Sequence, residues 1–139
     1  MDVGLGQTRP GVPGAPEAAV ILLDSNAVIW LLKRHHRTRT LERASQLYLS
    51  PSTVLEMQIL AEAGRLDLPL GAVALTQDPR WLLDEPPAMK WFAAATDVSW
   101  TRDPFDRLIV AHARVRGWKL ATSDGMLLEQ LPASEVLPL

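Results

Sequence analysis

Residues 20–32 read Val-Ile-Leu-Leu-Asp-Ser-Asn-Ala-Val-Ile-Trp-Leu-Leu, and this stretch decides the fold class. The first four residues form a continuous apolar run, which is typical of a parallel strand buried on both faces. The next three, Asp24-Ser25-Asn26, carry the short polar side chains that cap helix N-termini. The apolar segment 27–32 then predicts a short helix. A buried strand that passes directly into a helix indicates an alternating α/β chain.

The same succession of strand, polar junction and helix recurs further along the chain. We predict strands at 46–49, 97–100 and 118–122, helices at 52–63, 88–95 and 104–116, a short amphipathic piece at 79–84 and a last apolar piece at 135–137. This order predicts a three-layer α/β sandwich, in which helices cover both faces of a central, mostly parallel sheet of about four to five strands.

Residues 1–19 differ in composition from the rest of the chain. Glycine and proline recur between Gly4 and Pro16, and no hydrophobic period is visible there. Such a stretch buries too little apolar surface to offset the entropy of ordering it. We therefore expect a disordered leader at 1–19 and one folded domain at 20–139.

Charge and cysteine content exclude several classes of protein. The 14 Lys and Arg against 16 Asp and Glu give a formal net charge of −2, which argues against a protein that coats nucleic acid by bulk positive charge. The absence of cysteine excludes disulfides, thiolate metal sites and thiol catalysis. No apolar run approaches the roughly 18 residues of a membrane helix and no signal peptide is visible, so we expect a cytoplasmic protein that binds no membrane.

Four acidic residues stand where predicted strands give way to helices. Asp24 and Asp124 end the first and last of these strands, while Glu56 and Asp106 lie in about the first turn of the helices after the second and third. Ligands of such sheets bind outside the carboxyl ends of the strands, so we expect the four carboxylates to converge. Clustered carboxylates repel one another, and a divalent cation relieves that repulsion. Oxygen donors without Cys or a well-placed His favour Mg²⁺ or Mn²⁺ over Zn²⁺.

Each acid has an alternative reading as part of a helix terminus. Asp24 and Asp124 are placed to be plain N-caps. Glu56 follows Thr53 at the spacing of a capping box. Asp106 follows Asp103 at a position where a carboxylate interacts favourably with the helix dipole. The sequence leaves both readings open for every single acid, and the recurrence at four junctions favours a metal site.

At this level of detail the chain resembles the PIN-domain family. The matching stretches are Val-Ile-Leu-Leu-Asp-Ser-Asn-Ala-Val-Ile-Trp-Leu-Leu at 20–32, Leu-Ser-Pro-Ser-Thr-Val-Leu-Glu at 49–56 with Gly-Arg-Leu at 64–66, Arg-Asp-Pro-Phe-Asp-Arg-Leu-Ile-Val-Ala-His-Ala at 102–113, and Leu-Ala-Thr-Ser-Asp at 120–124. Their order and spacing agree across residues 20–139, and the branch they resemble most is the VapC-type toxins.

The resemblance implies a Mg²⁺- or Mn²⁺-dependent endoribonuclease, neutralised by a small VapB-like antitoxin and often a homodimer. It implies in-line hydrolysis of an RNA phosphodiester, which leaves 5′-phosphate and 3′-hydroxyl ends. Residue by residue it implies four catalytic acids, of which three hold metal directly or through water (Asp24, Asp106 and Asp124) and one acts through ordered water or positions the nucleophile (Glu56). The residues it implies as supporting the site are Ser25, Asp103 and Ser123, with Asp103 better read as a helix cap. Asn26 departs from the family, which commonly has histidine there.

One dense basic stretch follows the first helix. Its members Lys33, Arg34, Arg37 and Arg39 could hold RNA phosphates on the rim of the acidic crevice, or could form a solvated loop. His112 lies on a broadly apolar helix and is predicted to be a core histidine rather than a catalyst.

Other functions remain as alternatives. A non-catalytic PIN-like module would bind RNA or protein without cleaving it, and the presence of all four acids speaks against it. A phosphoaspartate receiver needs paired acids after the first strand and a lysine after a late strand, whereas here one acid ends the first strand and Lys119 precedes the late strand's core. Most of the five tryptophans are expected in the core, while Trp30 and Trp81 flank helices with apolar faces and could serve a dimer or antitoxin groove.

Overall fold

The computed structural model describes residues 19–139, and the predicted leader at 1–19 lies, apart from its last residue, outside the described residues. Five parallel strands form one sheet in the order β3-β2-β1-β4-β5. These strands are β1 Val20–Leu23, β2 Gln46–Leu49, β3 Leu82–Leu83, β4 Lys119–Thr122 and β5 Val136–Pro138. The expected α/β sandwich with a parallel central sheet is therefore confirmed.

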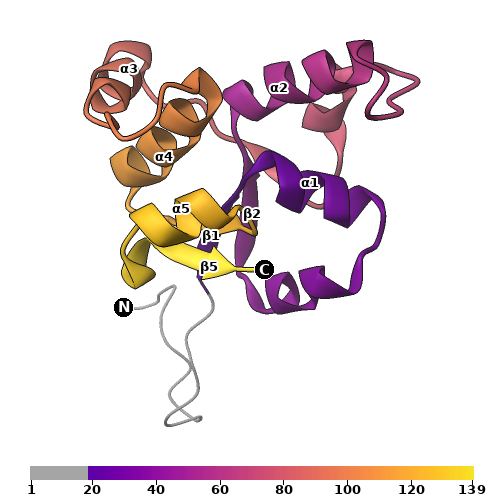
Figure 1. Ribbon diagram of the computed structural model, residues 1–139. Coiled ribbons are helices and arrows are strands. Elements are labelled where there is room, and N and C mark those ends of the chain that lie inside the picture. The colour runs from indigo at the N-terminus through magenta and orange to yellow at the C-terminus, as the bar shows by residue number, and fades with distance from the viewer. Residues whose placement is uncertain (1–18) are drawn as a thin grey trace, which may run out of the picture.

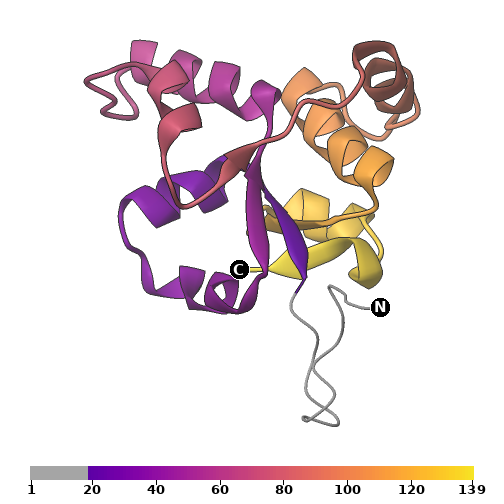
Figure 2. The ribbon, with the colours of Figure 1, turned by 180° about the vertical axis from the view of Figure 1, so that it is seen from behind.

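Helices cover both faces of this sheet. They are α1 Ser25–Leu32, α2 Pro51–Glu62, α3 Ala88–Thr96, α4 Pro104–Arg116 and α5 Gly125–Gln130, with short 3₁₀ helices η1 His36–Arg43, η2 Ala72–Gln77 and η3 Ala133–Glu135. Figures 1 and 2 show α1 and η1 on one side of the strands and α4 and α5 on the other.

Alternate side chains of β1 fill the two cores that result. Ile21 and Leu23 pack with α1, η1, α2 and η2, whereas Leu22 packs with α4 and α5. All three residues are almost fully buried, as expected when successive side chains of a central strand point to opposite covered faces. The continuous apolar run of β1 is therefore required by the three layers.

The predicted strand at 97–100 is wrong. Asp97 is the C-cap of α3, and residues 98–103 form the connection to α4. Val98 is buried in the core beside α4, so the apolar residue anchors a loop rather than a strand. The edge place next to β2 is taken by β3, which lies within the piece predicted at 79–84. Two residues are too few to show the alternation that identifies a strand.

The basic stretch predicted as a loop is in part helical, because η1 begins at His36. The other helices agree with the expectation to within one or two residues at each end. Gly117 ends α4 in the left-handed conformation, with a φ of 70°. No helix within residues 19–139 is long and apolar enough to cross a membrane.

The chain order of the strands fixes where a ligand can enter. From β1 the chain passes to β2 on one side, and it later returns to β4 on the other side of β1. The helices after β1 and β4 leave on opposite faces of the sheet, and this opens a crevice at the carboxyl ends of these two strands. Asp24 and Asp124 follow these two strands directly.

Candidate active site

Asp24 links the end of β1 to the start of α1. Its Oδ1 accepts a hydrogen bond of 2.7 Å from the Ala27 N–H, so it is the N-cap of α1. The residue is only 5% exposed. Burial raises the pKa of Asp24 to about 6, and the negative charges of Asp124 and Asp106 add to this shift. The hydrogen bonds from Thr122 and Ala27 act in the opposite direction without cancelling it.

Asp124 has the same place at the end of the neighbouring strand β4. Its Oδ1 accepts hydrogen bonds from the N–H groups of Met126 at 2.9 Å and Leu127 at 3.0 Å, so it caps α5. Both bonds go to one oxygen, and Oδ2 has no hydrogen-bond donor within the described part of the chain. A capping role thus occupies one oxygen and leaves the other for the crevice. The two readings that the sequence left open do not exclude each other.

Asp103 and Asp106 both stand at the start of α4, in different roles. Asp103 Oδ1 accepts from the Phe105 N–H at 2.8 Å and the Asp106 N–H at 3.3 Å, which makes Asp103 the cap, as predicted. Asp106 is half-buried and accepts no hydrogen bond within residues 19–139. Burial raises the pKa of Asp106 to about 6, with further contributions from the charges of Asp103, Asp124 and Glu56. Asp106 reaches the crevice from the first turn of a helix, as predicted, but α4 follows a loop and not the predicted third strand.

Glu56 approaches from α2. Ser50 is the N-cap of that helix and accepts from the Ser52 N–H, so the capping box that was the alternative reading of Thr53 and Glu56 does not form. Glu56 is the sixth residue of α2, on its second turn. Burial raises the pKa of Glu56, and the charges of Asp103 and Asp24 add to the shift, whereas a hydrogen bond from the Ser25 hydroxyl opposes it.

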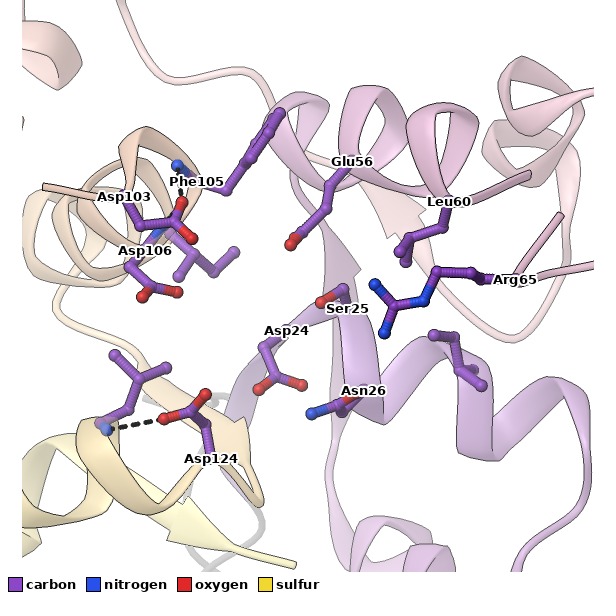
Figure 3. Close-up of a pocket in the computed structure, with 13 residues that line it drawn as sticks. Asp24, Ser25, Asn26, Glu56, Leu60, Arg65, Asp103, Phe105, Asp106 and Asp124 are labelled. Carbon is purple, nitrogen blue, oxygen red and sulfur yellow. Dashed lines mark hydrogen bonds between the residues drawn. The ribbon is translucent and has the colours of Figure 1, made fainter. Parts of the chain in front are cut away.

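These side chains enclose a crevice of about 330 Å³. Figure 3 shows the carboxylates of Asp24, Glu56, Asp106 and Asp124 directed toward a shared space from four different elements. All four predicted catalytic acids line it, together with Ser25 and Asp103. Each pKa shift described above contains a charge contribution from another acid of the group, so these carboxylates repel one another across the crevice.

Some predicted site residues lie elsewhere. Ser123 does not line the crevice, and neither do Lys33, Arg34, Arg37 and Arg39. Arg34 and Arg39 line a separate hollow beyond the C-terminal end of α1. The eight residues of α1 rise about 12 Å, and this carries the basic stretch away from Asp24.

Two polar residues of the crevice were not predicted as site residues. Asn26 and Arg65 both line it, and Figure 3 shows them on the side formed by α1 and α2. Asn26 follows Asp24 by two residues, so its place could have been read from the motif. The position of Arg65 depends on the turn after α2, where the sequence shows only a glycine, Gly64, after the predicted helix.

The two remaining sequence predictions concern buried side chains. His112 is fully buried, with Nδ1 2.8 Å from Ser50 Oγ and Nε2 2.8 Å from Asp84 Oδ2, so it is a core histidine as predicted. Trp81 is also buried, and its Nε1 donates to the Leu75 carbonyl at 2.8 Å. Of the two alternatives left open for Trp81, the structure therefore supports a core residue and not part of a partner groove. Trp30 is half-buried and stacks on His35.

The donor chemistry of the crevice fits a hard divalent cation. It offers carboxylate oxygens at a solvent-accessible site, with neither sulfur nor imidazole among its lining residues. Within residues 19–139 no three acidic or histidine side chains lie close enough to surround a metal ion by themselves. Mg²⁺ commonly keeps several waters and takes only one or two carboxylates, so this spacing suits a hydrated ion.

Comparison with known proteins identifies the family. The sequence model of the PIN domain matches residues 21–132. Ribonuclease VapC22 of Mycobacterium tuberculosis is 30% identical over 115 residues, which cover 77% of this chain and 88% of the relative. The chain belongs to the PIN domain family.

Solved structures show the same fold at lower identity. A toxin–antitoxin complex from Klebsiella pneumoniae contains a chain that aligns with a TM-score of 0.63 and 16% identity, covering 84% of this chain and 95% of that one. VapBC2 from Rickettsia felis, bound to a DNA fragment from its promoter, aligns with a TM-score of 0.62 and 12% identity, covering 86% and 98%. These matches span nearly the whole length of the solved chains.

Proposed function

We propose that this protein is a divalent-metal-dependent endoribonuclease of the VapC type. The observation that carries the proposal is the convergence of four acids, from four elements, on one crevice in a chain that is 30% identical to a ribonuclease of this family. The raised pKa values of Asp24 and Asp106 support it, because burial and the neighbouring acids both disfavour their charged forms, and a bound cation would offset this.

The residues divide into two groups by what they can do. Asp24, Asp106 and Asp124 would hold Mg²⁺ or Mn²⁺, in part through its waters, and Glu56 would orient the attacking water. A bound metal supplies charge neutralisation at the phosphoryl oxygens and lowers the pKa of a coordinated water. The caps at Asp24 and Asp124 fix those carboxylates by backbone N–H donors, so that they need no reorganisation when substrate binds.

Ser25 is proposed to support the site through Glu56. Ser25 lines the crevice together with Glu56, and its hydroxyl lowers the pKa of the Glu56 carboxyl against the larger effect of burial. It therefore favours the charged form of Glu56, which is the form that can accept a proton or orient water. Asp103 is proposed to act only as the cap of α4.

Partners follow from the same family membership. The solved relatives are toxin–antitoxin complexes, and we propose a small VapB-like antitoxin and a homodimer for this chain as well. Exposed apolar side chains on α2 (Leu55 and Ile59) and on α3 (Met89 and Phe92) support a protein partner. Both helices lie at the top of Figure 1, on either side of α4. Because the proposed substrate is RNA, we propose that the protein acts in the cytoplasm.

The test is cleavage of single-stranded RNA by the purified protein. We expect cleavage with Mg²⁺ or Mn²⁺, none after EDTA, and recovery when metal is restored. Asp106→Asn should reduce cleavage by orders of magnitude, whereas Asp103→Asn should keep most of it, because Asn caps a helix about as well as Asp. RNA binding without cleavage under every metal condition would contradict the proposal and favour a non-catalytic binding module.

A further inference from the structure

Arg65 is the one cationic side chain that lines the crevice within the described residues 19–139. The other charged residues there are five acids, namely Asp24, Glu56, Asp103, Asp106 and Asp124. Figure 3 shows the guanidinium entering between α1 and α2, on the side away from Asp106 and Asp124. Asp103, Asp106 and Asp124 thus lie on one side of the crevice, and a single positive charge lies on the opposite side.

The backbone after α2 fixes this position. Gly64 adopts a φ of 75°, a left-handed conformation that residues with a Cβ rarely take. The Gly64 N–H donates to the Ala61 carbonyl at 3.0 Å and the Arg65 N–H donates to the Leu60 carbonyl at 2.9 Å. This pair of bonds is a Schellman motif, which reverses the chain and returns Arg65 alongside the last turn of α2. The place of Arg65 is therefore built into the end of the helix.

The guanidinium is available to a ligand. Within residues 19–139 no ion pair and no side-chain hydrogen bond involves Arg65, although it lines the same crevice as five acids. By contrast, Arg80 and Arg116 are held by Asp78 and Asp84. An unpaired Arg presents several N–H donors in a planar fork that matches the oxygens of a phosphate.

A second donor lies on the same wall. Asn26, on the first turn of α1, is exposed and lines the crevice. Figure 3 shows its side chain on the same side as Arg65, with the amide nitrogen directed into the crevice. An amide and a guanidinium offer N–H donors to an anion, whereas the opposite wall offers oxygen acceptors to a cation. The two walls therefore suit two different parts of one substrate.

We infer that Arg65 binds an RNA phosphate next to the one that is cleaved. The scissile phosphate lies toward Asp24, Asp106 and Asp124, and the neighbouring phosphate of the strand lies against Arg65 and Asn26. This inference rests on the proposed function, because it requires RNA in the crevice. In this arrangement Arg65 positions the RNA strand, whereas the acids act at the scissile phosphate.

The experiment compares wild type with Arg65→Gln and Arg65→Lys in steady-state cleavage of a short single-stranded RNA at several salt concentrations. Lys119→Gln is the matched control, because Lys119 is exposed at the amino end of β4, at the far end of the strand from the crevice. Melting temperatures of all four proteins establish that each is folded.

We expect Arg65→Gln to raise KM about tenfold, as for loss of a hydrogen bond to a charged group, and to change kcat much less. The slope of log KM against log salt should fall by about 0.7, the value for one phosphate contact on a single strand. Arg65→Lys should keep the salt slope and raise KM by less than Arg65→Gln does. Lysine keeps the positive charge but lacks the planar set of N–H donors of the guanidinium. Lys119→Gln should match wild type.

Four results would overturn the inference, and they are distinguishable. An unchanged KM and salt slope in Arg65→Gln would overturn it while leaving the proposed nuclease intact. A loss confined to kcat, or a loss of affinity for the antitoxin at unchanged KM, would give Arg65 a different role. Failure of the wild type to cleave RNA with any divalent metal would overturn the proposed function and this inference with it.

Discussion

His112 and Ser50 are 62 residues apart in the sequence, yet the Nδ1 atom of the His112 ring lies 2.8 Å from the Ser50 hydroxyl. His112 belongs to α4, and Ser50 is the N-cap of α2. The opposite ring nitrogen, Nε2, lies 2.8 Å from Asp84, which also accepts from Arg116 at 2.8 Å. A carboxylate only accepts, so the neutral ring donates from Nε2 and accepts the Ser50 proton at Nδ1.

These hydrogen bonds of His112 connect α4 and α2, the two helices that carry Asp106 and Glu56. Neither acid contacts His112, but the relative position of α2 and α4 sets the width of the crevice between them. Trp91 connects α3 to α4, because its Nε1 donates a hydrogen bond to the Leu108 carbonyl at 2.8 Å. The site thus depends on buried polar contacts that lie away from the crevice.

Replacing His112 with alanine should therefore destabilise the fold strongly. We expect a loss of about 2–4 kcal/mol of unfolding free energy, because the change leaves a cavity and removes a buried partner from both Ser50 and Asp84. Urea denaturation followed by circular dichroism measures it. His36→Ala is the control, since His36 is exposed and should cost less than about 1 kcal/mol. Equal losses for the two variants would show that these hydrogen bonds of His112 contribute no stability.

Gly64→Ala tests the turn that places Arg65. An alanine Cβ at this position would meet no atom within 4 Å, so the cost comes from the backbone conformation alone. We expect about 1 kcal/mol of destabilisation because of the positive φ. Gly125→Ala is the matched control, since its Cβ also meets no atom within 4 Å and its φ is not positive. It should be neutral or slightly stabilising, and an equal effect of both changes would contradict the argument.

The sequence alone predicted the features that depend on a short run of neighbouring residues. The apolar run at 20–23 and the polar junction at Asp24 predicted β1 and the cap of α1, and the family motifs placed all four acids. Strand β3 has only two residues, too few to show an alternation of apolar and polar side chains. Its place at the sheet edge depends on pairing with β2. Arg65 could not be assigned to the crevice, because its position depends on a helix-terminal turn and on the packing of α1 against α2. For a related reason the sequence left open whether the basic stretch lies on the rim of the crevice, because this depends on the length of α1, which separates the stretch from Asp24.

Asp106→Asn should stabilise the metal-free protein at neutral pH. The carboxylate is half-buried, accepts no hydrogen bond within the described residues and is repelled by Asp103, Asp124 and Glu56. Removing its charge relieves that repulsion, so the melting temperature in EDTA should stay the same or rise. The contrasting variant is Asp103→Ala, which should cost about 1 kcal/mol because it removes the cap of α4. A clear drop in the melting temperature of Asp106→Asn would mean that the Asp106 carboxylate stabilises helix α4, and would contradict its role as a metal ligand.

The change of the unfolding free energy with pH should reflect the protonation of Asp24. Its pKa is about 6 in the folded protein and 3.8 in the unfolded chain, so the folded state binds its proton more tightly. The stabilisation from the bound proton is complete below pH 3.8 and is lost as the pH rises through 6. By pH 7 the buried charge therefore costs up to about 3 kcal/mol. Burial lowers the pKa of His112 below 6.5, so its contribution is present above pH 6.5 and is lost on acidification, the opposite direction.

Comparing Asp24→Asn with wild type in EDTA separates these two groups, because His112 is present in both proteins. Asn keeps the cap of α1 and has no charge to bury. We expect the variant to exceed wild type in unfolding free energy by more at pH 7 than at pH 4.5, where Asp24 is already largely protonated in the folded protein. Urea titrations at the two pH values measure the difference. Adding Mg²⁺ at pH 7 should then stabilise wild type more than the variant, because the cation offsets the same buried charge. A gap between the two proteins that is the same at both pH values would show that Asp24 is charged throughout, and that its place in the crevice does not raise its pKa.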